Sequence, residues 1–281
     1  MKKTISAHTV AAIFFIMALV CAGCSTNRDS ITVITREEGS GTRSAFVELT
    51  GLLVDGIDQT AATAETNSST AVVMQTVIGN KYAIGYISLG SLNEAVKAVQ
   101  VDGVEVTADN IKNGTYPIAR PFNVAAKRDL SNTAQDFLNF ILSDEGQTVV
   151  TDSGYVSIGT AGAFNSANPS GTVTIAGSSS IAPVMEKLAE AYMAVNSAAM
   201  IKIQASDSST GMSSVIEGLS DIGMASRTVK DSELAQGLTS TTICMDGIAV
   251  VVNNNNAVEN LQLEQIQQIF SGKITTWSDI P

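Results

Sequence analysis

The sequence predicts an α/β fold with largely parallel sheets. Runs of β-branched and apolar residues, such as ITVIT at residues 31–35, are typical of buried strands. Segments of helical length and pattern follow most of these runs, and this alternation favours parallel strands joined by helices. Removal of a short leader would leave roughly 250 residues, which suits one large domain or two smaller lobes.

The expected elements alternate along the chain, and only one stretch inside the chain has the composition of a linker. That stretch, residues 159–171, is small and polar and contains one Pro. Strands are expected at residues 31–35, 81–89, 96–101, 172–176, 201–205 and 248–253. Helices are expected at residues 44–49, 70–78, 133–150, 183–194, 211–217 and 263–270.

The first 23 residues have the layout of an export signal. Lys2 and Lys3 precede an apolar run at residues 11–20, and small residues then lead to Cys24. The run LVCAGC resembles a bacterial lipoprotein signal, although Cys21 stands where that pattern usually has Leu. We therefore expect lipidation of Cys24, a tether at residues 24–30 and an anchor on the outer face of the membrane. The alternative is an ordinary secretory peptide with an incidental cysteine.

Several classes of chemistry are excluded by composition. The only histidine, His8, lies in the leader, so the exported chain has no Ser-His or Cys-His pair and no His-ligated metal. Cys244 would be a lone cysteine in an apolar setting, which is typical of a buried small hydrophobe, and no disulfide is expected. A net charge of −11 argues against nucleic acid but not against a small anion held by backbone N–H groups.

Three segments share one design, in which a strand leads through Gly, Ser and Thr residues into a helix. They are ITVITREEGSGTRSAF, TVTIAGSSSIAPVMEKL and IKIQASDSSTGMSSVIEG. Helix N-termini offer unpaired N–H groups and partial positive charge, so together these loops predict an anion site. Each loop alone is an ordinary capped turn, but Arg36 and Arg227 lie beside or near two of them and could bind a tetrahedral oxyanion.

Nucleotide hydrolysis and serine catalysis are poorly supported. The GSGT run is not followed by the Lys of a Walker loop, and no G-x-S-x-G motif surrounds Ser40. The adjacent carboxylates Glu37 and Glu38 have neither a nucleophile nor a metal to act with. An enzyme that uses a serine nucleophile stays an alternative, and no cofactor is expected.

Several motifs are similar to those of one family. TVTIAGSSSIAPVMEKLAEAY, DIGMASR, DGIAVVVN, IFSGKITTWSDI, TREEGSGTR and IGYISLGSL resemble the phosphate-binding protein of the phosphate-specific ABC transporter, across nearly the whole exported chain. The resemblance implies a two-lobed periplasmic-binding-protein type II fold that closes on phosphate. It also implies an ABC-transporter permease as partner, an extracytoplasmic location and a monomer that is not an enzyme.

The order of the motifs differs from that of the family and indicates a circular permutation. In the family, TVTIAGSSS opens the mature protein, whereas here it follows the GSGT segment. The family's own ends would be joined at residues 159–171, and new ends would be opened at 280–281 and 29–30. One lobe, lobe B, would then comprise residues 31–115 plus 246–281, and the other, lobe A, residues 116–245.

The resemblance also assigns candidate ligand-binding residues. Ser226 falls where some relatives have an aspartate that accepts the proton of phosphate, so Glu38 and Asp207 are candidate substitutes, although either could be a solvated turn carboxylate. One such acceptor would favour phosphate over sulfate. The candidates are Arg36, Glu38, Ser40, Gly41, Thr42, Ser179, Ser180, Ser208 with the adjacent Ser209, Ser226 and Arg227. The alternatives to a phosphate importer are a binder of another tetrahedral oxyanion such as sulfate, and a surface or sensor protein without a transport role.

Overall fold

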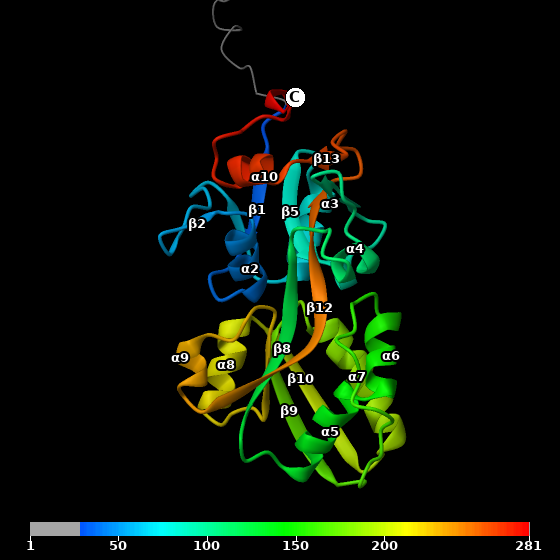
Figure 1. The fold of residues 1–281 in the computed structure, drawn as a ribbon. Coiled ribbons are helices and arrows are strands. Elements are labelled where there is room, and N and C mark those ends of the chain that lie inside the picture. Colours follow the sequence, from blue (N-terminus) through cyan, green and yellow to red (C-terminus); the bar gives the residue numbers. More distant parts are fainter. Residues whose placement is uncertain (1–28, 281) are drawn as a thin grey trace, which may run out of the picture.

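The computed structural model describes residues 29–280, so the predicted leader and Cys24 lie outside the described residues. The chain forms two lobes, one above the other, linked by two long strands that run through both (Figure 1). These strands are β8 (Ala119–Lys127) and β12 (Leu238–Val252). Within residues 29–280 no helix has the length and apolar character needed to cross a bilayer.

The upper lobe surrounds the parallel strands β1, β4 and β5, against which the upper half of β12 pairs antiparallel. Its helices cover this sheet (Figure 1). The elements of this lobe are β1 (Thr32–Arg36), α2 (Gly41–Leu49), β2 (Leu53–Val54), β3 (Ile57–Asp58), β4 (Glu65–Asn67), α3 (Thr70–Gly79), β5 (Ala83–Ser88), η2 (Leu89–Ser91), β6 (Lys97–Ala98), β7 (Gln100–Val101), α4 (Ala108–Lys112), β13 (Asn260–Leu261), α10 (Leu263–Phe270) and η3 (Trp277–Asp279).

The lower lobe repeats this plan. Strands β9, β10 and β11 are parallel, and β8 and the first half of β12 complete their sheet in antiparallel orientation. Its other elements are α5 (Asn132–Leu142), α6 (Asp144–Asp152), β9 (Gly171–Ser178), α7 (Ala182–Val195), β10 (Ala199–Ser206), α8 (Ser208–Ile216), β11 (Ile222–Ala225) and α9 (Asp231–Leu234). The α/β fold that the sequence predicts is therefore confirmed. The expected predominance of parallel pairing is wrong, because β8 and β12 pair antiparallel with their neighbours, and the described strands form five parallel and five antiparallel pairs.

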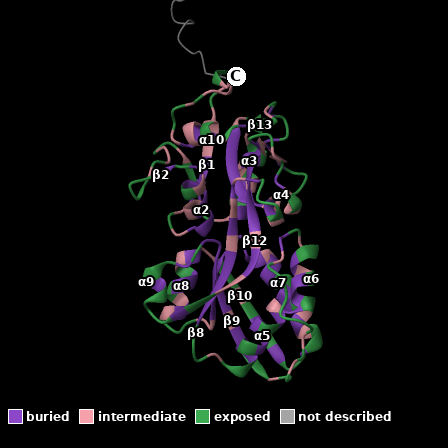
Figure 2. Cartoon of the chain, in the orientation of Figure 1, coloured by how far each residue is buried: buried purple, intermediate pink, exposed green. Residues whose placement is uncertain are grey.

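Each lobe has its own hydrophobic core. The upper core is built around Ile34, Phe46 and Phe270, and the lower core around Phe122, Phe137 and Tyr192. Figure 2 shows the long strands β8 and β12 largely buried and the edge strand β10 partly exposed, while the helices bury one face and expose the other. Because the two cores are separate, the lobes can move relative to one another about β8 and β12.

The structure corrects the prediction of a single helix at residues 133–150. Ser143 ends α5, since its backbone N–H donates to the Phe140 carbonyl, and its Oγ then accepts from the N–H of Gly146 to begin α6. At Gly146 a Cβ would lie 2.0 Å from the Phe140 carbonyl oxygen, so this tight turn requires glycine. A serine that serves as both C-cap and N-cap divides the segment into two helices.

Two further differences concern strands. The predicted strand at residues 96–101 is two short strands, β6 and β7, which pair with different partners, β12 and β13. The long strand β8 was not predicted, and its run ARPFNVAAK contains Pro121, a residue that interrupts most ladders. Pro121 is tolerated because it lies beyond the end of β11 and is paired only with Met245 of β12.

Candidate functional site

The loops that the sequence selects for an anion site meet in the cleft between the lobes. Strands β1, β9 and β10 all end there, and α2, α7 and α8 begin there, because the carboxyl ends of parallel strands lie at one edge of a sheet. A fourth helix, α3, also begins at the cleft with Thr70, which follows the N-cap Ser69. The cleft therefore gathers helix N-termini from both lobes.

Hydrogen bonds join the two lobes at these helix starts. Thr42 Oγ1 and Ser180 Oγ share a hydrogen bond of 2.8 Å, and Thr70 Oγ1 lies 3.1 Å from the same Ser180 oxygen. Arg36 Nη2 donates to Ser179 Oγ at 3.2 Å. Thr42, Thr70 and Ser180 are buried, so these contacts lie in the interior of the closed cleft.

A set of three further buried serines, Ser178, Ser208 and Ser226, lies on the lower-lobe side of the cleft beside Ser180. Ser178 Oγ donates to Ser226 Oγ at 2.9 Å, and the N–H of Ser226 donates to Ser208 Oγ at 3.1 Å. Gly41 of the upper lobe packs against them, since a Cβ on it would lie 2.3 Å from Ser208 Oγ. Glycine at this position lets the α2 N-terminus approach the serines closely.

Arg36 is the cation of this site, and its side chain is only 2% exposed. Its Nε and Nη2 donate to the Glu37 carboxylate at 2.8 and 2.7 Å, and Nη1 donates to Thr70 Oγ1 at 3.3 Å. The backbone N–H of Arg36 donates to the Tyr86 hydroxyl at 3.1 Å, and the Tyr86 ring stacks on Phe46. This packing fixes the guanidinium at the boundary between the lobes.

A second buried arginine supports the site from the crossing strands. Arg120 of β8 donates through Nε and Nη2 to Asp246 Oδ2 of β12, at 3.2 and 3.1 Å, and through Nη1 to the Ser226 carbonyl at 3.0 Å. Burial raises the pKa of Asp246 to about 6, while the charge of Arg120 and a hydrogen bond from Ser88 oppose that shift. The pair therefore connects the strands that link the lobes to a serine of the site.

Three predicted site residues lie at the margin of the cluster. Arg227 is bound by Glu233 at 2.7 and 2.9 Å and donates to Ser209 Oγ at 3.4 Å, so it faces α9 rather than the three serines. Glu38 is exposed. Asp207 is the N-cap of α8 and accepts from Thr210 N at 2.9 Å and Thr210 Oγ1 at 2.6 Å.

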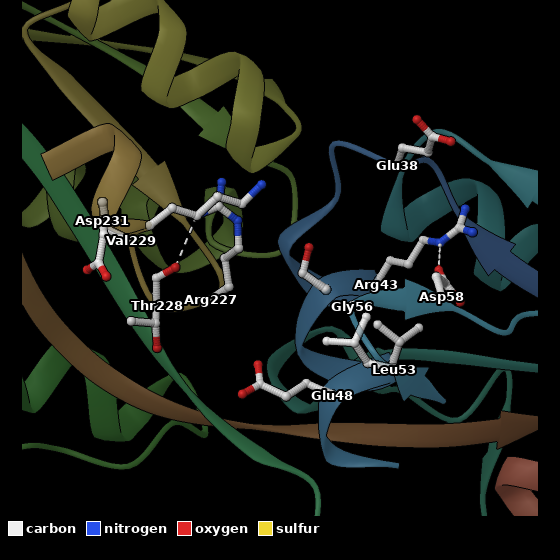
Figure 3. Close-up of a pocket in the computed structure, with 13 residues that line it drawn as sticks. Glu38, Arg43, Glu48, Leu53, Gly56, Asp58, Arg227, Thr228, Val229 and Asp231 are labelled. Carbon is white, nitrogen blue, oxygen red and sulfur yellow. Dashed lines mark hydrogen bonds and ion pairs between the residues drawn. The ribbon is translucent and has the colours of Figure 1, made fainter. Parts of the chain in front are cut away.

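Outside the serine cluster, the lobes border an open groove of about 730 Å³ (Figure 3). Residues from both lobes line this groove. Glu38 and Arg43 belong to the upper lobe, and Arg227 and Asp231 belong to the lower lobe. Arg43 is bound to Asp58 at 2.8 Å, as the dashed line in Figure 3 marks. Glu38 thus belongs to this outer groove.

Several members of the cluster, among them Thr70, Arg120 and Asp246, are not among the residues predicted from the sequence. Thr70 could have been found, because ETNSSTAVVM at residues 65–74 repeats the design of a strand, Ser and Thr residues and then a helix. Arg120 and Asp246 carry no local signal, since 126 residues separate them. The chemistry of the cluster suits a small anion, which hydroxyls, N–H groups and one guanidinium could hold. Residues 29–280 contain no group of three or more His, Cys, Asp or Glu side chains placed to hold a metal ion.

A two-lobed α/β fold with a cleft between its lobes is the architecture of type II periplasmic binding proteins, the class that the sequence predicts. A family model described as "PBP superfamily domain" matches residues 18–145 and 162–281. The chain is 47% identical over 272 residues to "Phosphate-binding protein PstS 2" of Streptococcus agalactiae, and the match covers 93% of each chain.

The crystal structure of a phosphate ABC transporter, phosphate-binding protein from Streptococcus pneumoniae superposes with a TM-score of 0.71 at 46% identity. That match covers 90% of this chain and 100% of the other. "Phosphate-binding protein PstS" of Bacillus subtilis is 34% identical over 130 residues, which cover 46% of this chain and 42% of that protein. The chain belongs to the PBP superfamily and, within it, to the family of PstS phosphate-binding proteins. The family predicted from the motifs is thus confirmed, whereas the circular permutation stays a prediction.

Proposed function

We propose that this protein is an extracytoplasmic solute-binding protein that captures inorganic phosphate and delivers it to an ABC importer. The observation that carries the proposal is the convergence of Arg36, Thr42 and Thr70 of one lobe on Ser179 and Ser180 of the other. The names of the relatives specify phosphate among the anions that such a site could take. The protein would act by binding rather than by catalysis.

The bound anion would exchange its water shell for hydroxyls, helix N-terminal N–H groups and the Arg36 guanidinium. Hydrogen bonds to an ionised partner are about twice as strong as neutral ones, so a buried set of donors compensates for the lost hydration. Ligand contacts from both lobes stabilise the closed form over the open one, and that difference would signal occupancy to the importer.

Selectivity for phosphate over sulfate requires a group that accepts the phosphate proton. A serine hydroxyl can accept as well as donate, and Ser226 Oγ lies within the buried serine set. The Glu37 carboxylate contacts Arg36 inside the cluster, which makes it a better-placed acceptor than the exposed Glu38. We therefore propose Ser226 and Glu37 as the groups to examine for this role.

Isothermal titration calorimetry of the purified protein with phosphate, and with sulfate in parallel, tests the proposal. We expect saturable heat with phosphate and much weaker heat with sulfate. Tight binding of sulfate and none of phosphate would favour the alternative oxyanion binder, and no heat with either anion would contradict both.

We also propose a lipid anchor at Cys24 and a monomeric state, both of which rest on the sequence. Replacement of Cys24 by Ala should release the protein from cell membranes into the medium or periplasm, as cell fractionation would detect. Sedimentation of the protein without its leader should give the mass of one chain. Retention of the Cys24→Ala protein in the membrane fraction would contradict the anchor.

The proposed circular permutation is supported by the proximity of the predicted new ends. The backbone of Ser30 pairs with that of Thr276, and the N–H of Trp277 donates to the Asp29 carbonyl at 3.0 Å. Fusion of these ends and cleavage within residues 159–171 would restore the family's order. We expect the protein rearranged in this way to fold and to bind phosphate, because nearby surface ends tolerate both joining and cutting.

A further inference from the structure

Gly39 lies directly opposite Asp207 across the cleft. A Cβ built on Gly39 would lie 2.3, 2.6 and 3.1 Å from three atoms of the Asp207 side chain, and these are its nearest neighbours. The φ angle of Gly39 lies outside the left-handed region, so its own backbone conformation does not require glycine. Glycine is needed here because of the opposite lobe.

The same residue makes a backbone hydrogen bond between the lobes. The N–H of Ser209, in the first turn of α8, donates to the Gly39 carbonyl at 3.2 Å. Arg227 donates to Ser209 Oγ, and Glu233 in turn holds Arg227, so the α8 side of the contact is fixed within its lobe. The first-turn N–H groups of a helix have no partner inside the helix and are therefore free to bond across the cleft.

Asp207 has little freedom to move aside. Its carboxylate accepts from both the N–H and the hydroxyl of Thr210 and so caps α8. Rotation of this side chain away from Gly39 would break the cap, which typically stabilises a protein by about 1 kcal/mol. The contact is therefore tight on both sides.

We propose that Gly39, Asp207 and Ser209, here called the closure contact, determine how closely the two halves of the anion site approach. These are positioning residues, and the inference rests on the proposed function. Ser40, Gly41 and Thr42 follow Gly39 in the chain, and Ser208 lies between Asp207 and Ser209. Any side chain at position 39 would hold the two sets of ligand-binding groups apart.

The consequence is a change in affinity without a change in the groups that bind. A protein whose closed form is less populated binds its ligand more weakly by the same factor. If closure of the Gly39→Ala protein requires loss of the α8 cap, phosphate should bind about fivefold more weakly, or worse.

The test is titration of four proteins with inorganic phosphate: the wild type, Gly39→Ala, Gly39→Ala with Asp207→Gly, and Gly79→Ala. The double variant removes the three atoms that lie nearest to the new Cβ, and glycine is tolerated at a helix N-cap. Gly79 is the matched control, because a Cβ there meets nothing within 4 Å. We expect weaker binding for Gly39→Ala, recovery to within about threefold of wild type for the double variant, and no change for the control.

Small-angle X-ray scattering gives a second readout, independent of the heat of binding. The wild type should become more compact when phosphate is added, and Gly39→Ala should need a higher phosphate concentration for the same change. Wild-type affinity in Gly39→Ala, or no recovery in the double variant, would overturn the inference while leaving the proposed function intact. Absence of phosphate binding by the wild type would instead refute the proposed function.

Discussion

Thr42 Oγ1 and Ser180 Oγ lie 2.8 Å apart although 138 residues separate them in the chain. One belongs to the first turn of α2 in the upper lobe, and the other to the loop before α7 in the lower lobe. Both side chains are buried. The site is thus a contact between lobes. A substitution at Thr42 or Ser180 can therefore change ligand binding without removing a residue from the hydrophobic core of either lobe.

Replacement of Ser180 by Ala should weaken phosphate binding by roughly 30-fold. The change removes the hydroxyl that contacts both Thr42 and Thr70, and each hydrogen bond of this kind contributes about 1 kcal/mol. Calorimetric titration measures the effect. Ser213→Ala, on the exposed face of α8, is the matched control and should bind as the wild type does. Equal affinities for the two variants would contradict the role of Ser180.

Replacement of Arg36 by Lys should weaken phosphate binding by at least about tenfold, even though the charge is kept. Lysine lacks the planar fork that contacts Glu37, Thr70 and Ser179 together, and hydrogen bonds to charged groups contribute about 1.5–3 kcal/mol each. The control is Arg128→Lys, at an exposed position. If the Arg36→Lys protein kept wild-type affinity, the guanidinium geometry would have no part in binding.

The pair of Arg120 and Asp246 should show strong coupling in a double-mutant cycle. Asp246→Ala or Arg120→Met alone leaves an unpaired buried charge, which costs about 3–5 kcal/mol of unfolding free energy. The double variant should lose less than the sum of the two, because no buried charge is left alone. Urea unfolding measures all four proteins. Additive losses would show that the two side chains act independently.

Glu233→Gln should destabilise the protein by about 1 kcal/mol at neutral pH and by less in acid. Burial by itself would raise the pKa of Glu233, but hydrogen bonds from Arg227 and the Lys230 backbone, with the charge of Arg227, hold that pKa below 4.5. The contribution of Glu233 is therefore present above its unfolded-state pKa and is lost as the pH falls through its folded-state pKa.

Urea unfolding of the wild type and Glu233→Gln at pH 7 and at pH 3 measures that dependence. The difference in unfolding free energy between the two proteins should shrink at pH 3. Glu190→Gln, at an exposed position of α7, is the control and should leave stability unchanged at both pH values. A difference that grew in acid would contradict the assigned direction of the pKa shift.

The sequence predicted the elements whose causes are local. The strand at residues 31–35 and the helix at 263–270 follow from β-branched runs and apolar periodicity, and the structure has β1 and α10 there. The break at Ser143 was missed because a Ser inside an apolar helical pattern does not by itself reveal that it caps two helices. Strand β8 was missed because Pro121 is tolerated only by its place in the sheet.

The residues of the candidate site likewise comprise some that local patterns predict and others that they do not. The loops at Ser40, Ser179 and Ser208 were selected from their position before helices, and the structure brings all three to the cleft. Thr70 repeats that pattern and was overlooked, although its helix was predicted. The pairing of Arg227 with Glu233 could not be predicted, because an arginine near a Ser-rich loop is compatible with either a ligand or a carboxylate partner.

By itself the sequence determined several of the strands, such as β1, most of the helix starts and the class of ligand, because helix caps and strand propensity depend on neighbours a few residues apart. The hydrogen bond from Arg43 N to Ser40 Oγ, for example, spans three residues. Only the tertiary structure decided which hydroxyls face one another across the cleft, which arginine contacts the serines, and why residue 39 is glycine. Those relationships depend on the packing of two separate cores about β8 and β12, and no local pattern encodes that packing.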